Sequence, residues 1–116
     1  MFTIDHKRGD TISWEGTYTD DLGGVVDLTT YSIKCQARSK ENKSIVLFTV
    51  STADNTIDKY NPTQGLYRIV LDTSTFPVGR YLVDIEYQVG QLIKSSETFE
   101  LNIIEDITKW QQLLLL

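Results

Sequence analysis

The stretch FPVGRYLVDIEYQVG, residues 76–90, decides the fold because apolar and polar side chains alternate along it. Its apolar positions are Tyr81, Val83, Ile85 and Tyr87. The positions between them hold Leu82 and three polar residues, Asp84, Glu86 and Gln88. Successive side chains of a β-strand point to opposite faces. The period of two therefore predicts a strand with one buried face and one solvated face.

The same alternation recurs between turn-forming residues along most of the chain. It predicts about seven strands, near residues 2–5, 11–18, 31–38, 44–50, 66–72, 79–89 and 94–104, with a weak eighth at 56–60. The turn at Gly90 is short enough to join the last two long strands as a hairpin. Short strands without helices between them are typical of an antiparallel sandwich or barrel. We therefore expect one all-β domain over residues 1–105, followed by an apolar tail over 106–116.

Length and composition bound the class of protein. The chain has 116 residues, of which 41% are hydrophobic and 23% are charged, as in a single soluble domain. Its formal net charge of -5 argues against a nucleic-acid partner, which attracts positive surfaces. The one cysteine, Cys35, predicts no internal disulfide. No stretch approaches the ~20 apolar residues of a membrane helix and no signal peptide is evident, so we expect synthesis in the cytosol and no membrane partner.

Two Gly-x-Tyr units, ending in Tyr67 and Tyr81, each open a predicted strand directly after a turn. In immunoglobulin-like sandwiches, a tyrosine at such a corner often bonds its hydroxyl to the backbone a few residues upstream. Either tyrosine fits that role. Two core tyrosines at strand starts fit the sequence equally well.

Residue types suited to catalysis are few. The one histidine, His6, lies near the N-terminus and Cys35 is predicted to face inward, so we expect no nucleophile–base pair. Asp84 and Glu86 share the polar face of the strand at 79–89 and suggest a two-carboxylate hydrolase. That mechanism needs carboxyl groups whose pKa values differ, whereas two acids on one open face ionise alike. We therefore expect a solvated strand face, no enzyme activity and no cofactor.

Two further motifs carry weak signals. Asp20, Asp21 and Asp27 offer three carboxylates for calcium, but without the regular spacing of a known calcium loop. The tripeptide RGD at residues 8–10 is associated with integrin attachment, which requires a protruding loop. Because a predicted strand follows directly, we expect Gly9 to make the turn between the first two strands and no metal to bind.

The C-terminal segment EDITKWQQLLLL has the strongest apolar signal outside the predicted strands. Trp110, Leu113 and Leu114 have the i, i+3, i+4 spacing of one helix face, after a capping residue at Asp106 or Thr108. An exposed apolar cluster usually marks a contact with a partner or another subunit. The alternative is a tail that folds back on its own sandwich. The predicted contact residues are Trp110, Leu113, Leu114 and Leu116, together with Val46, Phe48 and Val50 of the apolar run at 44–50.

As a set, several motifs resemble a known family. They are RGDT, GxVVDLT, GLYRIVL, FPVGRYLVDIEY and SSETFELNI, and they extend over residues 1–105. This set is similar to the small immunoglobulin-like modules of tailed-phage virion proteins, especially the N-terminal domain of phage baseplate upper proteins. The resemblance implies an immunoglobulin-like fold and a role in anchoring virion components. Because a coiled coil and a receptor-binding head do not follow residue 116, we expect a free-standing structural protein.

The resemblance therefore implies an assembly protein of a tailed-phage particle, in the tail, baseplate, neck or head surface. Its partners would be other virion proteins or copies of itself, and its location the virion after synthesis in the host bacterium. An alternative is an adhesion module that binds a surface glycan or protein through loops or aromatic residues such as Trp14.

Overall fold

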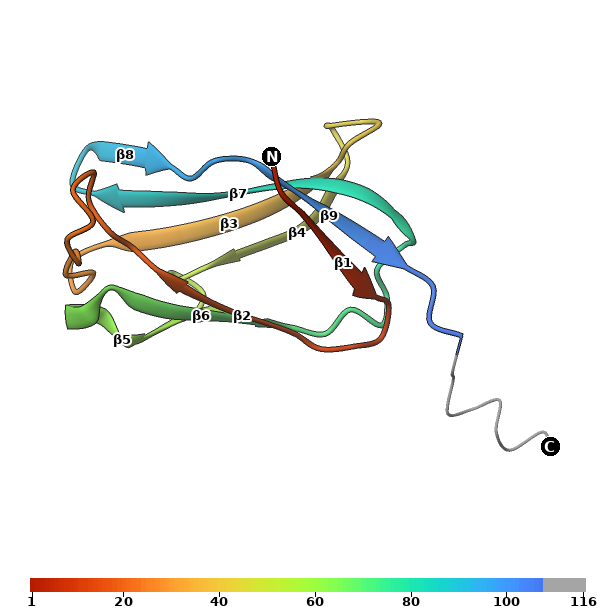
Figure 1. Cartoon of the computed structure of the whole chain (residues 1–116), viewed down its shortest axis with the longest axis horizontal. Helices are drawn as coiled ribbons and strands as arrows, with labels where there is room; N and C mark the ends of the chain where they lie inside the picture. Colours follow the sequence, from red (N-terminus) through yellow and green to blue (C-terminus); the bar gives the residue numbers. More distant parts are fainter. Residues whose placement is uncertain (108–116) are drawn as a thin grey trace.

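The computed structural model describes residues 1–107, which form two β-sheets packed face to face (Figure 1). The all-β prediction is confirmed, but these residues contain nine strands instead of about seven. The strands are β1 (Thr3–Lys7), β2 (Ile12–Thr17), β3 (Ser32–Ser39), β4 (Val46–Ser51), β5 (Ile57–Asn61), β6 (Leu66–Leu71), β7 (Gly79–Val89), β8 (Leu92–Ser95) and β9 (Phe99–Ile104). A short 3-10 helix, η1 (Pro62–Gln64), precedes β6.

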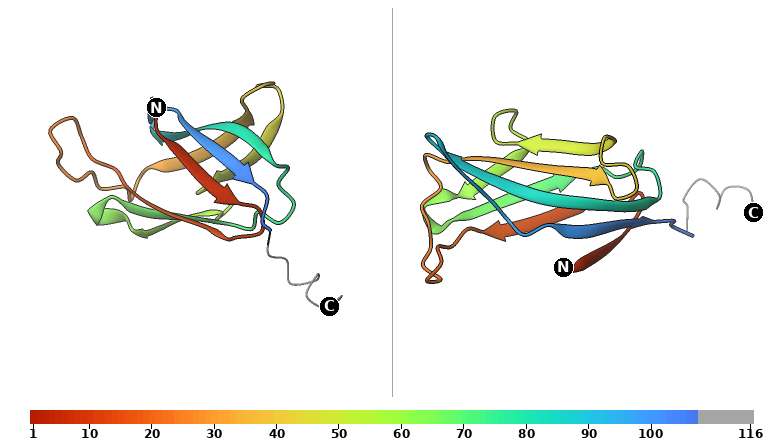
Figure 2. Two further views of the ribbon diagram at one scale, coloured as in Figure 1. Left: turned by 45° about the vertical axis from the view of Figure 1, so that its right-hand side comes forward. Right: turned by 90° about the horizontal axis from the view of Figure 1, so that it is seen from above.

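The two sheets differ in size. The large sheet has the strand order β1-β9-β7-β3-β4, with β8 also paired to β7, and the small sheet has the order β2-β6-β5. All pairs are antiparallel except β1 and β9, which run parallel. The expected purely antiparallel arrangement is wrong at this pair, because β1 leaves its sequence neighbour β2 and joins the last strand of the other sheet (Figure 2).

The core lies between the sheets and is lined by the faces that the alternation predicts. On β7, Tyr81, Val83 and Tyr87 are buried, whereas Asp84 and Gln88 are exposed. Alternation on β3 is equally regular, whereas all four residues of β8 are exposed and Glu100 of β9 is buried between Phe99 and Leu101. The other buried residues of the core are Ile12, Leu28, Ile33, Cys35, Ala37, Phe48, Val50, Ile57, Tyr67, Ile69, Phe99, Leu101 and Ile103.

The predicted strand at 94–104 is two strands. β8 continues the hairpin from β7, as the turn at Gly90 predicts, and β9 then pairs with the first half of β7. Between them, the Ser96 backbone N–H donates to the Ile85 carbonyl, while the Ser96 hydroxyl accepts from the Ile85 N–H. A serine side chain thus replaces one ladder bond, and the interruption is invisible to a period-two pattern.

The apolar run at 44–50 owes its continuity to a bulge in β4. Ala37 of β3 pairs with Phe48 and Arg38 pairs with Val46, so Leu47 is the extra residue. Such a bulge disturbs the alternation locally. Leu47 therefore packs against the core beside Phe48, which is buried.

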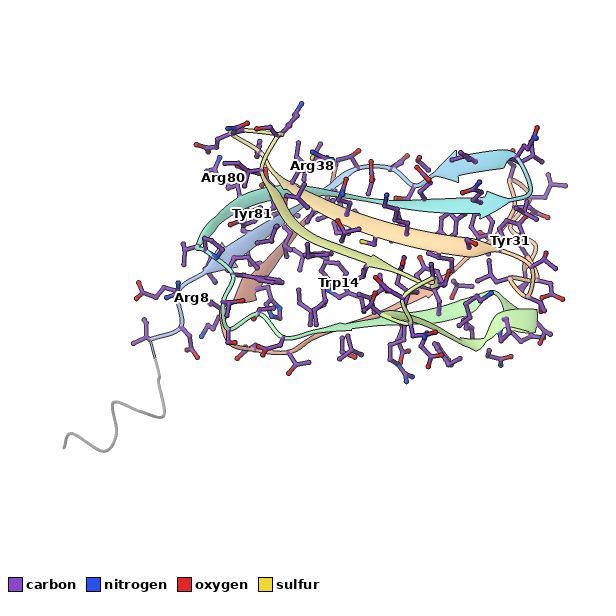
Figure 3. All side chains as sticks on the ribbon, turned by 180° about the vertical axis from the view of Figure 1, so that it is seen from behind. Arg8, Trp14, Tyr31, Arg38, Arg80 and Tyr81 are labelled. Atoms are coloured by element: carbon purple, nitrogen blue, oxygen red, sulfur yellow. The ribbon has the colours of Figure 1, made fainter. Side chains whose placement is uncertain are left out.

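Tyrosine hydroxyls satisfy two polar positions of the core. Tyr81 donates to the Pro77 carbonyl at 2.7 Å, four residues upstream, as predicted for one of the two Gly-x-Tyr units (Figure 3). Tyr67 instead shares a 2.6 Å hydrogen bond with the Tyr87 hydroxyl, which joins the two sheets. Of these two tyrosines, Tyr81 is therefore the one that bonds to backbone upstream of its strand.

The predicted C-terminal helix lies mostly outside the described residues, which end at 107. Among residues 1–107, no helix has the length and hydrophobicity needed to span a membrane.

Candidate functional site

One side of the sandwich is open. Among the described strands, β2 pairs with β6 alone and β1 pairs with β9 alone, so the small and large sheets each end in an edge strand here. A cleft of about 340 Å³ lies between these edges. It is lined mainly by apolar groups of Phe2, Ile4, Ser13, Trp14, Glu15, Gly16, Tyr67, Ile69, Ile85 and Phe99. This cleft is the strongest candidate for a binding site.

Trp14 lines the cleft, and it lies between the two sheets in Figure 3. Its indole meets the Phe99 ring edge-on, with a distance of 5.6 Å between ring centroids. The indole packs against the core but keeps part of its surface accessible, as do Ile4 and Ile85. A ligand that enters the cleft would therefore contact the accessible apolar surface of these three side chains.

Gly16 shapes the floor of the cleft. A Cβ at this position would lie 2.3 Å from Cζ of Tyr67, so only glycine lets the tyrosine ring cross β2. Burial is the main cause that raises the pKa of Tyr67, and the bond to Tyr87 adds to it. The Tyr67 hydroxyl therefore stays neutral and hydrogen-bonded in the interior.

A second cavity lies at the end of the sandwich where β2 leads to β3 and β7 turns into β8. Its volume is about 270 Å³ and its lining is Tyr18, Tyr31, Tyr87, Val89, Leu92, Ile93 and Lys94. Tyr18 stacks on Tyr87 with 4.0 Å between ring centroids. Leu92 and Leu22 at this end are 75% and 96% exposed. This loop end is a second candidate surface.

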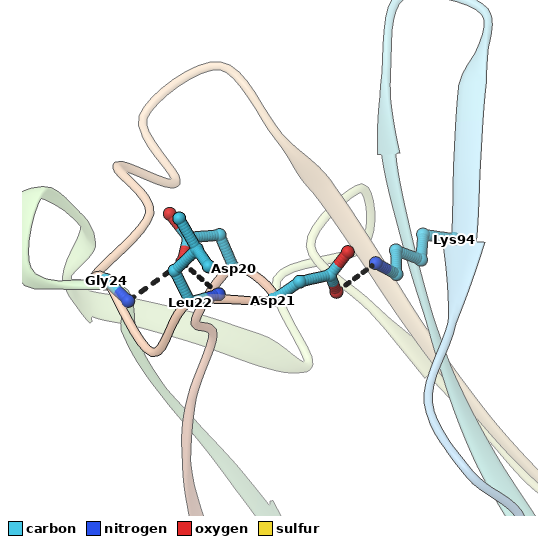
Figure 4. Close-up of polar contacts among 5 residues, drawn as sticks. All are labelled: Asp20, Asp21, Leu22, Gly24 and Lys94. Atoms are coloured by element: carbon cyan, nitrogen blue, oxygen red, sulfur yellow. Dashed lines mark hydrogen bonds and ion pairs between the residues drawn. The ribbon is translucent and has the colours of Figure 1, made fainter.

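The three carboxylates considered as calcium ligands, and for which we expect no metal, have other partners. Asp20 Oδ1 accepts bonds from the backbone N–H groups of Leu22 and Gly24, and Asp21 forms a 3.2 Å ion pair with Lys94 (Figure 4). Asp27 accepts from Thr29, whose hydroxyl lowers the pKa of the Asp27 carboxyl. Within residues 1–107, no group of three or more acidic, His or Cys side chains is placed to hold a metal ion.

The RGD tripeptide forms the turn between β1 and β2, as predicted, with Gly9 at a positive φ of 99°. The buried Thr73 hydroxyl accepts from the Gly9 N–H at 2.9 Å and donates to the Asp10 carbonyl at 2.7 Å. His6 Nε2 lies 2.7 Å from the same carbonyl oxygen. Hydrogen bonds to Thr73 thus hold the tripeptide against the β6–β7 loop.

The other titratable candidates lie apart from the cleft. Asp84 and Glu86 are on the outer face of the large sheet, opposite Gln36 and Lys34 of β3. Asp84 borders a surface cavity of about 250 Å³. Cys35 is fully buried, and burial is the main cause that raises the pKa of its thiol to about 12. The thiol is therefore protonated in the folded chain at neutral pH.

The predicted contact residues have different positions. Phe48 and Val50 are buried between the sheets, whereas Val46 is 43% exposed. Phe48 and Val50 therefore cannot reach a partner without movement of β4. Trp110, Leu113, Leu114 and Leu116 lie outside the described residues.

Sequence patterns do not reveal the cleft. Alternation places Trp14 inward and predicts a strand at 2–5, but no local signal shows that the side between β1 and β2 stays open.

Comparisons with protein-family models, curated proteins and solved structures found no match to this chain.

Proposed function

We propose that the chain is a non-enzymatic assembly protein of a tailed-phage particle, with an immunoglobulin-like fold. It holds virion components together through protein–protein contacts, and its location is the virion. The observation that carries the contact role is the open side, where an apolar cleft borders the edge of β2. The phage assignment is supported by the resemblance of the strand motifs over residues 1–105.

The strand order supports the immunoglobulin-like assignment. In such sandwiches one sheet contains the order B-E-D and the other G-F-C, to which variable-type domains add C′. The orders β2-β6-β5 and β9-β7-β3-β4 correspond to these in chain sequence as well as in space. The Tyr81 bond to Pro77 at the start of β7 matches the tyrosine corner of strand F. The chain departs from antibody domains by having one cysteine and hence no disulfide between sheets.

The cleft suits a protein partner because it combines the unpaired backbone groups of an edge strand with accessible apolar side chains. An edge strand presents backbone donors and acceptors that another strand can pair with. Side chains of such an added strand can then enter pockets beside the edge, which is the mode of recognition called β-augmentation. Here Ile4, Trp14 and Ile85 supply the apolar surface. A partner contributing an extended apolar segment fits this site.

The proposal is tested in the phage that encodes the chain. We expect mass spectrometry of purified particles to detect the protein at a fixed copy number. The variant Ile4→Lys changes a half-buried residue of the cleft, whereas Thr3→Lys adds the same charge on the exposed face of β1. Both proteins should fold, but only Thr3→Lys should be incorporated. Absence of the wild-type chain from particles, or equal incorporation of the two variants, would contradict the proposal.

A second function has one observation in its favour. The tyrosine-lined cavity at the loop end offers aromatic faces beside the exposed residues Leu22 and Leu92, as an adhesion module for a glycan or protein requires. A glycan array with the purified chain distinguishes the two. Adhesion predicts signals that Tyr31→Ala removes and Tyr60→Ala keeps, whereas an assembly protein gives no signals.

A further inference from the structure

We infer that the occupant of the cleft is the C-terminal segment, residues 108–116, of a second copy of this chain. The segment would pair as a strand with the free edge of β2. This inference rests on the proposed assembly function and names the partner at the same site.

The cleft accepts a strand better than a compact ligand. It runs beside β2 and receives residues from both sheets, Ile4 and Phe99 from the large one and Trp14 and Ile69 from the small one. Among residues 1–107, Glu15 is the one charged residue in its lining. An occupant that places apolar side chains between the sheets would extend the core, while its backbone completes the edge of the small sheet.

The segment TKWQQLLLL has the required length and chemistry. Its nine residues reach about 30 Å when extended, and the six residues of β2 span about 20 Å. The segment contains Trp110 and four consecutive leucines, with Lys109 as its one charged side chain. In an extended conformation, alternate leucines point toward the cleft and the others point away from it.

A second copy fits better than the same chain. Residues 105–107 continue beyond β9 and lead away from the sandwich in the right-hand view of Figure 2, and Ile107 is 88% exposed. To enter its own cleft, the chain would have to reverse direction here. The stretch from Ile104 to Leu116 contains neither glycine nor proline, the residues that best form tight reversals. Continuing outward instead presents the segment to a neighbouring molecule.

Exchange of this kind has two geometric outcomes. If two copies insert their segments into each other, a closed dimer with a two-fold axis results. If each copy donates to the next, the head-to-tail contact forms a ring where the rotation closes and an open filament where it does not. In a closed dimer or a ring every cleft contacts a partner's segment, and in a filament every cleft except the terminal one does. Both suit a component of a symmetric particle.

The test uses cysteine cross-linking between full-length chains. One protein carries Ser13→Cys at the rim of the cleft, and the other carries either Leu113→Cys or Leu114→Cys. The native Cys35 is fully buried and should not react. We expect a disulfide-linked heterodimer from the mixture, with a yield that differs between positions 113 and 114 because a strand alternates. The matched control Thr49→Cys, exposed on β4 at the far edge of the large sheet, should give none.

A second measurement keeps the inference falsifiable. Light scattering on the unmodified chain should show a mass that rises to twice that of one chain or more as concentration increases. Replacing Leu113 and Leu115 by Ser in the full chain, or Ile4 by Lys, should return the mass to that of the monomer. A monomer at all concentrations would overturn the inference. So would a disulfide that forms within a chain carrying both Ser13→Cys and Leu113→Cys but never between two singly substituted chains. If Ile4→Lys is still excluded from particles in that case, the assembly function stands and only this occupant is wrong.

Discussion

The substitution Gly16→Ala tests the packing that forms the floor of the cleft. The added Cβ would lie 2.3 Å from Cζ and 2.4 Å from the hydroxyl oxygen of Tyr67. Carbon atoms in contact normally stay more than 3 Å apart, so the ring must move. Tyr67 is 3% exposed and its hydroxyl is bonded to Tyr87, so the ring cannot swing into solvent.

The expected cost of Gly16→Ala follows from three contributions. Overpacking a core costs about 1–3 kcal/mol. Loss of the Tyr67–Tyr87 hydrogen bond costs about 1 kcal/mol. Reduced freedom of the unfolded chain returns roughly 0.4–1 kcal/mol. The free energy of unfolding should therefore fall by about 2 kcal/mol, which lowers the melting temperature of a chain of this size by roughly 6–12 °C.

The assay is urea unfolding followed by tryptophan fluorescence, with Gly79→Ala as the matched control. Gly79 also lies in a strand, but a Cβ there would meet Tyr81 at an ordinary 3.6 Å. That variant should be neutral or slightly stabilised. In a Tyr67→Leu background, which lacks the clashing ring atoms, the cost of Gly16→Ala should nearly vanish. Equal stability of the two alanine variants, or an undiminished cost in the Leu background, would refute the packing argument.

Two further predictions concern buried polar groups. Tyr81→Phe removes the hydrogen bond to the Pro77 carbonyl and should lower the free energy of unfolding by about 1 kcal/mol. The control Tyr60→Phe changes an exposed tyrosine and should have little effect. Equal effects of the two variants in chemical denaturation would contradict the role of the Tyr81–Pro77 bond. Cys35 should react with a thiol reagent only after unfolding, since burial raises the pKa of its thiol to about 12, and rapid labelling of the native chain would contradict its burial. In the unfolded chain the Cys35 thiol ionises at about pH 8.5. The stability that the protonated, buried thiol contributes is therefore complete below that pH and is lost as the pH rises toward 12.

The candidate sites show which signals in the sequence are local. The turn at Gly9 and the inward position of Cys35 follow from turn chemistry and alternation, and both are confirmed. Alternation also identifies Tyr81 as a residue at the start of a strand, but it does not distinguish the Tyr81 bond from that of Tyr67. The hydrogen-bond partners of the two hydroxyls decide this, and one of them, the Tyr87 hydroxyl, is brought near Tyr67 only when the two sheets pack.

The apolar run at 44–50 shows the same limit. Its composition suggests a strand covered on both faces or at an interface. The bulge between β3 and β4 instead turns Phe48 and Val50 into the core and leaves Val46 exposed. A bulge depends on how two strands pair, so hydrophobicity along one of them cannot predict it.

By itself, the sequence determined that the chain is built of strands and which face of most strands is buried, because alternation with a period of two acts residue by residue. Only the tertiary structure decided which strands lie at the edges. A short turn joins β1 directly to β2, yet β1 pairs with β9, where Lys7 is the partner of Ile104. This long-range choice separates β1 from β2 and opens the cleft around Trp14, because each strand then belongs to a different sheet.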